Sequence, residues 1–228
     1  MGLLVKEKDI VVPGEVVAEG LDYLPGPFTY RLNDRVVAKR VGVVSVEGRA
    51  VKLLPLTGRY LPKIGDVVIG RVYDIVMSGW LIDLNCAYNS MLNSKDVPRF
   101  IRKGEDLTRY YDVGDYLRVQ IFNVTSQNLV DVSMKEPGLM KLTGGRVIKI
   151  NPNKVPRVIG KQGSMINLIK DKTGTMINIG QNGLVWVKGN TPEDELRAVN
   201  AITKIEGEAH LEGLTERMTT FLDSRGAF

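Results

Sequence analysis

Residues 144–170, GGRVIKINPNKVPRVIGKQGSMINLIK, decide the fold of the C-terminal part of this chain. Residues 146–150 form an apolar run that predicts a strand. Apolar side chains then recur at helical spacing in 155–159 and again in 165–169, which predicts two short helices. Residues 160–163, Gly-Lys-Gln-Gly, separate the two helices, so they form a tight turn.

The following residues complete a six-element pattern. Two apolar runs, MINIG and LVWVKG, flank Gln181-Asn182-Gly183, and Asn-Gly predicts a tight hairpin. Thr191 then caps a helix that has Pro192 in its first position. Residues 143–210 therefore predict a domain with the order βααββα, and residues 211–228 remain as a C-terminal tail.

Positive charge is concentrated in the same part of the chain. The whole sequence has a net charge of +5 and a pI near 9.2, which is compatible with a polyanionic partner but does not identify one. Residues 144–172 contain one acid, Asp171, and seven bases, so their local charge is +6. These bases are Arg146, Lys149, Lys154, Arg157, Lys161, Lys170 and Lys172.

The middle of the chain, residues 63–136, predicts a five-stranded barrel. Short apolar runs separated by glycine turns extend from Asp66 to Lys135. A charged stretch, Lys95 to Arg109, is predicted as the long loop between the third and fourth strands. Pro137-Gly138 ends the barrel, and Leu139 to Thr143 is expected to be a short connector.

Residues 1–62 predict a small β-rich domain. Turn residues interrupt short β-segments, and Val41 to Val46 and Ala50 to Leu54 flank Glu47-Gly48 as a possible hairpin. The predicted fold class is therefore multi-domain and mostly β with α+β.

Several kinds of chemistry are not expected. His210 is the single histidine and Cys86 the single cysteine, so no histidine triad, internal disulfide or zinc cluster is predicted. Carboxylates show no DxD or ExxE pair. We expect no catalytic residues, no metal and no cofactor. No run approaches the ~20 apolar residues of a membrane span, so we expect a cytoplasmic protein with no membrane partner.

The βααββα order with GKQG between two helices closely resembles a KH domain. This resemblance implies that Gly160 to Gly163 clamp the backbone of single-stranded RNA, since glycine lets the backbone approach phosphates closely. Lys154, Arg157 and Ser164 are expected to contribute contacts. The alternative is a tight turn between helices with no ligand.

Residues 64–135 resemble an S1-type RNA-binding domain, an oligonucleotide-binding (OB-fold) barrel, through the run IGDVVIGRV, the strand after Ser78-Gly79 and the closing LVDVSMK. RNA backbone contacts are expected from four bases of the charged stretch, Lys95, Arg99, Arg102 and Lys103. The aromatic positions on which such barrels stack bases are Ser78, Leu81 and Leu92 here. Trp80 and Tyr73 lie nearby and either stack on bases or belong to the core.

With its N-terminal segment IVVPGEVVAEG, nearly the whole chain resembles the RNA-binding cap subunits of the archaeal exosome. The resemblance implies an RNA-binding subunit without catalysis. Three cap chains would sit on a six-membered ring of RNase PH-like subunits of two kinds, which carries the active sites. Residues Val11, Val12, Pro13, Gly14 and Glu15 would lie in or near the ring interface, although a strand ending in a turn accounts for them equally.

Two other functions remain open on sequence grounds. The same modules could serve a free-standing ribosome or translation-associated factor, or the chain could itself be a nuclease. Co-purification with RNase PH-like proteins favours the adaptor, and product formation by the isolated chain favours the nuclease.

Overall fold

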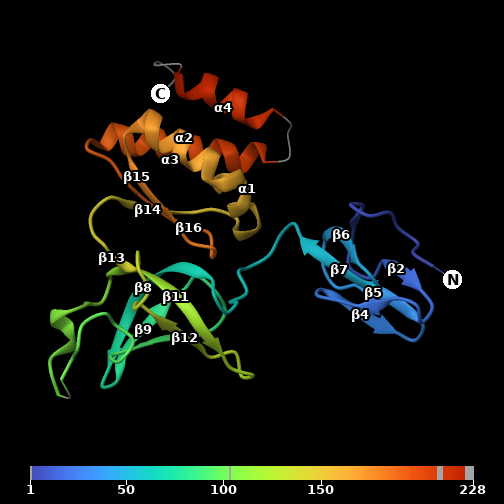
Figure 1. The fold of residues 1–228 in the computed structure, drawn as a ribbon, viewed down its shortest axis with the longest axis horizontal. Helices are drawn as coiled ribbons and strands as arrows, with labels where there is room; N and C mark the ends of the chain where they lie inside the picture. Colours follow the sequence, from blue (N-terminus) through green and yellow to red (C-terminus); the bar gives the residue numbers. More distant parts are fainter. Residues whose placement is uncertain (1, 103, 210–212, 224–228) are drawn as a thin grey trace. The chain divides into compact units, whose positions relative to one another are not determined.

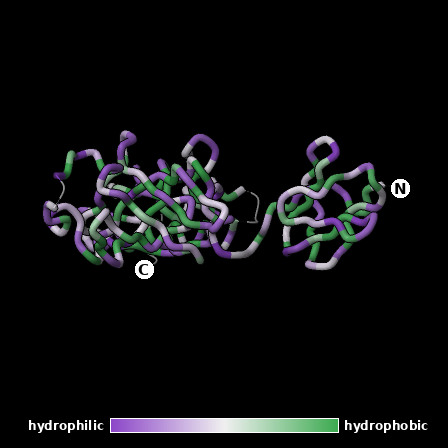
Figure 2. The backbone as a smooth tube through the Cα atoms, turned by 90° about the horizontal axis from the view of Figure 1, so that it is seen from below, coloured by the Kyte–Doolittle hydropathy of each residue, from purple (hydrophilic) through white to green (hydrophobic). Residues whose placement is uncertain are grey.

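The computed structural model describes residues 2–102, 104–209 and 213–223, which divide into one compact unit up to Gly58 and a second from Arg59 onward. The first unit is blue in Figure 1, and the second runs from cyan to red. Figure 2 shows hydrophobic and hydrophilic stretches alternating along the backbone, with hydrophilic loops at the margins of each unit. The predicted fold class, mostly β with α+β, is confirmed.

Two small sheets form the first unit, with strand orders β1-β6-β7-β3 and β2-β5-β4. Their strands are β1 (Ile10–Val11), β2 (Val16–Glu19), β3 (Leu24–Pro25), β4 (Thr29–Leu32), β5 (Arg35–Ala38), β6 (Gly42–Glu47) and β7 (Ala50–Pro55). The hairpin of β6 and β7 confirms the predicted turn at Glu47-Gly48. Apolar side chains from both sheets, among them Val11, Val36 and Leu53, make one core.

Five strands of the second unit close into a barrel, which we call the central barrel. They are β8 (Val67–Val76), β9 (Gly79–Asp83), β10 (Ser90–Asn93), β11 (Tyr116–Val124) and β12 (Val130–Ser133). β8 pairs with β9 and β11, β9 with β10, β10 with β12, and β12 with β11. Every strand therefore has two neighbours, as the predicted barrel requires.

The loop between β10 and β11, residues 94–115, is called the basic loop below. It contains the 3-10 helix η1 (Leu107–Arg109). Its apolar side chains Ile101, Leu107 and Tyr110 pack against the barrel core, and Tyr111 meets the buried Trp80 ring edge-on with 5.1 Å between ring centroids. The described part of the loop is therefore fastened to the barrel.

The connector predicted at Leu139 to Thr143 is wrong in one respect. Met140–Leu142 form strand β13, which pairs with the first half of β11. Pro137 and Gly138 end the preceding segment as expected, but β12 pairs only with the second half of β11, so the edge of the first half is open to Met140–Leu142. Tertiary pairing thus overrides the local turn signal.

The C-terminal domain confirms the predicted order βααββα. It comprises β14 (Arg146–Lys149), η2 (Pro152–Lys154), α1 (Val155–Ile159), η3 (Lys161–Gly163), α2 (Ser164–Thr173), β15 (Met176–Ile179), β16 (Leu184–Lys188) and α3 (Pro192–Glu208). The sheet order is β14-β16-β15. Thr191 caps α3 by accepting from the Asp194 N–H, as the sequence indicates.

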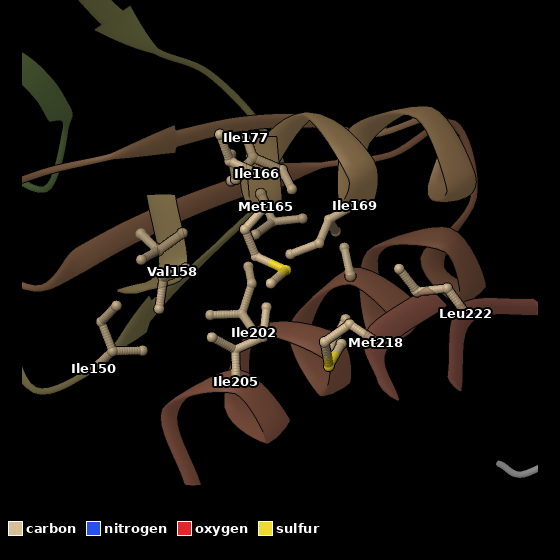
Figure 3. Close-up of a cluster of buried hydrophobic side chains, with 14 of the residues drawn as sticks. Ile150, Val158, Met165, Ile166, Ile169, Ile177, Ile202, Ile205, Met218 and Leu222 are labelled. Carbon is tan, nitrogen blue, oxygen red and sulfur yellow. The ribbon is translucent and has the colours of Figure 1, made fainter. Parts of the chain in front are cut away.

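A further helix lies in the segment that the sequence left as a tail. Helix α4 (Leu214–Asp223) contributes Leu214, Met218 and Leu222 to the same core as α2 and α3. Figure 3 shows Met218 and Leu222 beside Ile202 and Ile169 in this core. Burial of three large apolar side chains makes α4 an integral part of the domain.

The β15–β16 turn joins the C-terminal domain to the central barrel. Asn182 is fully buried: its Nδ2 donates to the carbonyl oxygens of Ile69 (2.6 Å) and Leu84 (2.8 Å), and its Oδ1 accepts from the Ile69 N–H (3.3 Å). Apolar side chains of both parts complete the junction, namely Ile69, Leu142, Leu184 and Trp186. The two modules therefore belong to one compact unit and are joined by these buried contacts.

Candidate nucleic-acid interface

Gly160 to Gly163, called the clamp loop below, forms the turn between α1 and α2. Gly160 has φ 76°, and a Cβ there would lie 2.7 Å from the Met165 nitrogen, so neither the conformation nor the space admits a side chain. Gly163 has φ 81°, and a Cβ there would make only ordinary van der Waals contacts, with Asn167 Nδ2 at 3.6 Å as the nearest atom, so its requirement is conformational. Lys161 and Gln162 between them are exposed. The backbone is thereby presented to solvent beside two polar side chains.

Cations and a helix terminus surround the clamp loop. Arg157 is exposed and forms no ion pair with any described residue. Ser164 begins α2, whose N-terminus has no side-chain cap and so favours an anion. Arg157, Lys161 and Ser164 line one hollow of about 610 Å³, which the first turn of α4 bounds on another side. These residues are brought together as predicted.

Lys154 makes a hydrogen bond inside the domain. Its ammonium group donates to the Glu206 carbonyl oxygen (2.7 Å) near the C-terminal end of α3, where a positive charge is favourable. The Glu206 carboxylate also accepts from the Asn151 N–H. The hydrogen bond of Lys154 connects η2 to α3. Arg157 and Lys161, in contrast, form no ion pair with any described residue.

The basic loop carries the second group of predicted bases. Lys95, Arg99 and Arg102 are exposed, and Lys103 lies outside the described residues. The Arg102 N–H and the Tyr110 hydroxyl both donate to Glu105, which holds the pKa of that carboxyl below its usual value. Arg109 lies near Asp106 (3.9 Å), a pair that is exposed at both ends. The guanidinium groups of Arg99 and Arg102 have no such partner among the described residues.

The barrel face over β8 to β10 is poorly suited to RNA. Leu81 pairs with Asp74 and Met91, and Met91 pairs with Asp131, so carboxylates stand beside the apolar side chains of this face. Leu92, at a predicted stacking position, is fully buried. Trp80 is also fully buried and donates its Nε1–H to the Tyr111 carbonyl oxygen, so it belongs to the core. Tyr73 remains 43% exposed.

The predicted ring-contact segment lies at the edge strand β1 of the first unit. Val11 is fully buried, whereas Val12, Pro13 and Gly14 are exposed. The Val12 N–H donates to the Glu15 carboxylate (2.9 Å), and the Glu15 N–H to the Val12 carbonyl (3.1 Å). Ile10 is exposed on the same side of the strand as Val12, which leaves an apolar edge beside a stiff turn.

The described residues hold no group of three or more His, Cys, Asp or Glu side chains able to bind a metal. No described helix is long and apolar enough to cross a membrane. Cys86 is half-buried, and burial raises the pKa of its thiol, which makes it a weak nucleophile. His210 lies outside the described residues.

Two residues that bear on this interface do not stand out in the sequence. Asn182 has the sequence signal of a hairpin residue only, but its buried side chain joins the two modules. Phe100, between Arg99 and Ile101, has 88% of its side chain exposed. The sequence signal that could have singled out Phe100 is an aromatic residue within a basic stretch.

Three family models match successive parts of the chain. Residues 8–57 match the N-terminal domain of the exosome RNA binding protein RRP4, residues 59–105 match the S1 domain of RRP4, and residues 145–204 match the KH domain. Fold and motifs thus define the class, a protein that combines an S1 barrel with one KH domain.

Relatives extend the match over nearly the whole length. The exosome complex component Rrp4 of Methanothermus fervidus is 41% identical over 96% of this chain and 97% of that protein. Its counterpart in Thermococcus kodakarensis is 39% identical over 98% of this chain and 88% of that protein. A crystal structure described as an exosome complex RNA-binding protein shares 31% identity at a TM-score of 0.66, covering 72% of this chain and 95% of that one. The chain belongs to the Rrp4 family of exosome complex components.

Proposed function

We propose that this protein is a non-catalytic RNA-binding subunit of an archaeal exosome cap. It binds single-stranded RNA and guides the 3′ end into a phosphorolytic ring. In this proposal three such chains sit on a six-membered ring of two kinds of RNase PH-like subunits, which hold the active sites. We place the assembly in the cytoplasm. Family membership favours this function over a free-standing translation-associated factor.

One observation carries the proposal. The clamp loop, which contains the exposed Lys161 and has Arg157 beside it, and the basic loop are parts of one compact unit, whose two modules are joined through Asn182. A clamp that presents glycine backbone suits phosphates of an unpaired strand, because a duplex cannot enter so narrow a turn. Two separate basic surfaces within one compact unit would then bind one strand more tightly than either alone.

Salt dependence tests RNA binding directly. We expect the full chain to bind an unstructured RNA better than a duplex of the same length. The logarithm of the affinity should fall with the logarithm of salt concentration with a slope of about −3 if four phosphates are contacted at ~0.7 each. Fluorescence anisotropy over a range of salt concentrations gives the slope. A flat profile would contradict backbone binding.

Docking to the ring is tested at the apolar edge of β1. We expect the variant Ile10→Asp with Val12→Asp to lose co-elution with RNase PH-like subunits in size-exclusion chromatography, because two carboxylates would be buried in the interface. Both side chains are exposed, so the fold should persist. Leu21→Asp with Leu32→Asp, two exposed positions elsewhere in the unit, is the matched control. Assembly that survives the first variant would remove this edge from the interface.

A further inference from the structure

Phe100 is the most exposed of the large apolar residues described in the basic loop. Val97 is buried, Ile101, Leu107 and Tyr110 pack against the barrel core, and Val113 is 56% exposed. Phe100, next to Ile101, has 88% of its side chain exposed. A single exposed apolar side chain is common on soluble proteins, so exposure by itself assigns no role. The surroundings of the ring are what distinguish it.

The backbone on either side of Phe100 is held in place. Val97 and Ile101 anchor it to the barrel, and Arg102 and Glu105 close a turn through two hydrogen bonds, backbone N–H to carboxylate (3.0 Å) and N–H to carbonyl (3.1 Å). The Tyr110 hydroxyl donates to the same carboxylate (3.0 Å). An aromatic ring on a fixed backbone loses little conformational entropy when a ligand stacks on it.

Two arginines flank Phe100 in the chain. Arg99 precedes it directly and Arg102 follows two positions later, and both are exposed without an ion-pair partner among the described residues. Arg99 and Arg109 oppose the rise in the pKa of the Tyr110 hydroxyl that the hydrogen bond to Glu105 causes, so positive charge acts on this part of the loop. An exposed ring in a basic segment suits a ligand with flat faces and a negatively charged backbone.

The barrel face over β8 to β10 offers a weaker platform. Its apolar side chains Leu81 and Met91 carry no ring, and Asp74 and Asp131 are their direct cross-strand neighbours. Tyr73 on β8 is an aromatic residue, but it is 43% exposed against 88% for Phe100, and it directly precedes Asp74. Carboxylates beside this face repel phosphates, so Phe100 is the better placed ring for a stacked base.

We propose that Phe100 is a nucleobase-stacking site, on which one unpaired base of the RNA lies while Arg99 and Arg102 hold the adjoining phosphates. This inference deepens the proposed function and rests on it. Stacking of this kind is insensitive to sequence, because every base has a π-face. The site thus suits an adaptor that must hold strands of many sequences.

The test compares variants of the full chain against two ligands of equal length, an unstructured RNA and an abasic ribose-phosphate strand. We expect Phe100→Ala to bind the RNA about tenfold more weakly, the loss of one base stack. Phe100→Leu should lose nearly as much, and Phe100→Trp should bind like the wild type. The abasic strand should bind Phe100→Ala and wild type alike, because only the phosphate contacts remain.

Phe122→Ala is the matched control. Phe122 is another phenylalanine on the same barrel, 47% exposed on β11, and its neighbours Ile121 and Asn123 are uncharged. It should leave RNA affinity unchanged. Circular dichroism confirms that each variant is folded.

Three results would overturn the stacking site. Equal RNA affinity of Phe100→Ala and wild type would remove it while RNA binding itself stands. An equal loss on RNA and on the abasic strand would show that the ring only positions the arginines. Loss of ring assembly at unchanged RNA affinity would make Phe100 a protein contact. If the wild type binds neither strand in a salt-dependent way, the proposed function fails as well.

Discussion

Asn182→Ala should lower the free energy of unfolding by about 2–4 kcal/mol, although the substitution removes only one small side chain. The amide of Asn182 satisfies the N–H and carbonyl of Ile69 and the carbonyl of Leu84 in a fully buried position. Alanine leaves these three backbone groups without their partner, and a buried unsatisfied group costs far more than an average hydrogen bond contributes.

Urea unfolding followed by tryptophan fluorescence measures this effect, because Trp80 lies in the barrel core and Trp186 at the junction. Asn190→Ala is the matched control, since Asn190 is exposed in the loop before α3 and should change stability by less than ~0.5 kcal/mol. Asn182→Asp keeps the shape but sets a carboxylate oxygen against two carbonyl oxygens, so it should be at least as damaging. An unchanged urea midpoint for Asn182→Ala would show that the junction contributes no stability.

The same substitution should also change RNA binding in a length-dependent way. A strand long enough to reach both basic surfaces gains affinity from the link between them, which a loosened junction weakens. A strand that fills only one surface should be unaffected. Equal losses for both lengths would indicate damage to a single surface instead of to the link.

The double substitution Lys161→Asp with Gln162→Asp should cause the largest loss of RNA affinity. Its net charge falls by three units, two from Lys161 and one from Gln162, beside phosphates that the clamp loop would contact. Both side chains are exposed, so stability should change by only about ±0.5 kcal/mol per site. We expect RNA affinity at fixed ionic strength to fall by at least about tenfold, since each phosphate contact contributes to backbone binding.

Lys172→Asp with Thr203→Asp is the control for this experiment. It changes the charge of the same domain by the same three units, at exposed positions outside the clamp loop, and sacrifices one surface ion pair of Lys172 with Asp223. Arg157→Ala should show a smaller loss than the clamp variant. Unchanged affinity of a folded clamp variant would leave the basic loop as the main RNA contact.

The candidate site could be located from sequence because its residues are contiguous. The GKQG turn needs two glycines within four positions, and its neighbours Arg157 and Ser164 are placed by the helices on either side. Lys154 was also near the clamp in sequence, but its ammonium group turns toward the Glu206 carbonyl, which only the packing of α3 against η2 decides. Trp80 could not be assigned for the same reason, since its burial depends on Tyr111 of the basic loop.

By itself the sequence determined the order of strands and helices, the tight turns and the clamp loop, because apolar periodicity and the conformational needs of glycine act over a few residues. Tertiary structure decided which segments meet. β13 pairs with the first half of β11, and α4 contributes to the core of the C-terminal domain. Asn182 forms hydrogen bonds with Ile69, which is 113 positions earlier in the chain. Tertiary structure also decided that Phe100 is exposed to solvent whereas its neighbour Ile101 packs against the barrel core. Such pairings depend on burial between distant segments, whose free energy exists only once the chain has brought them together.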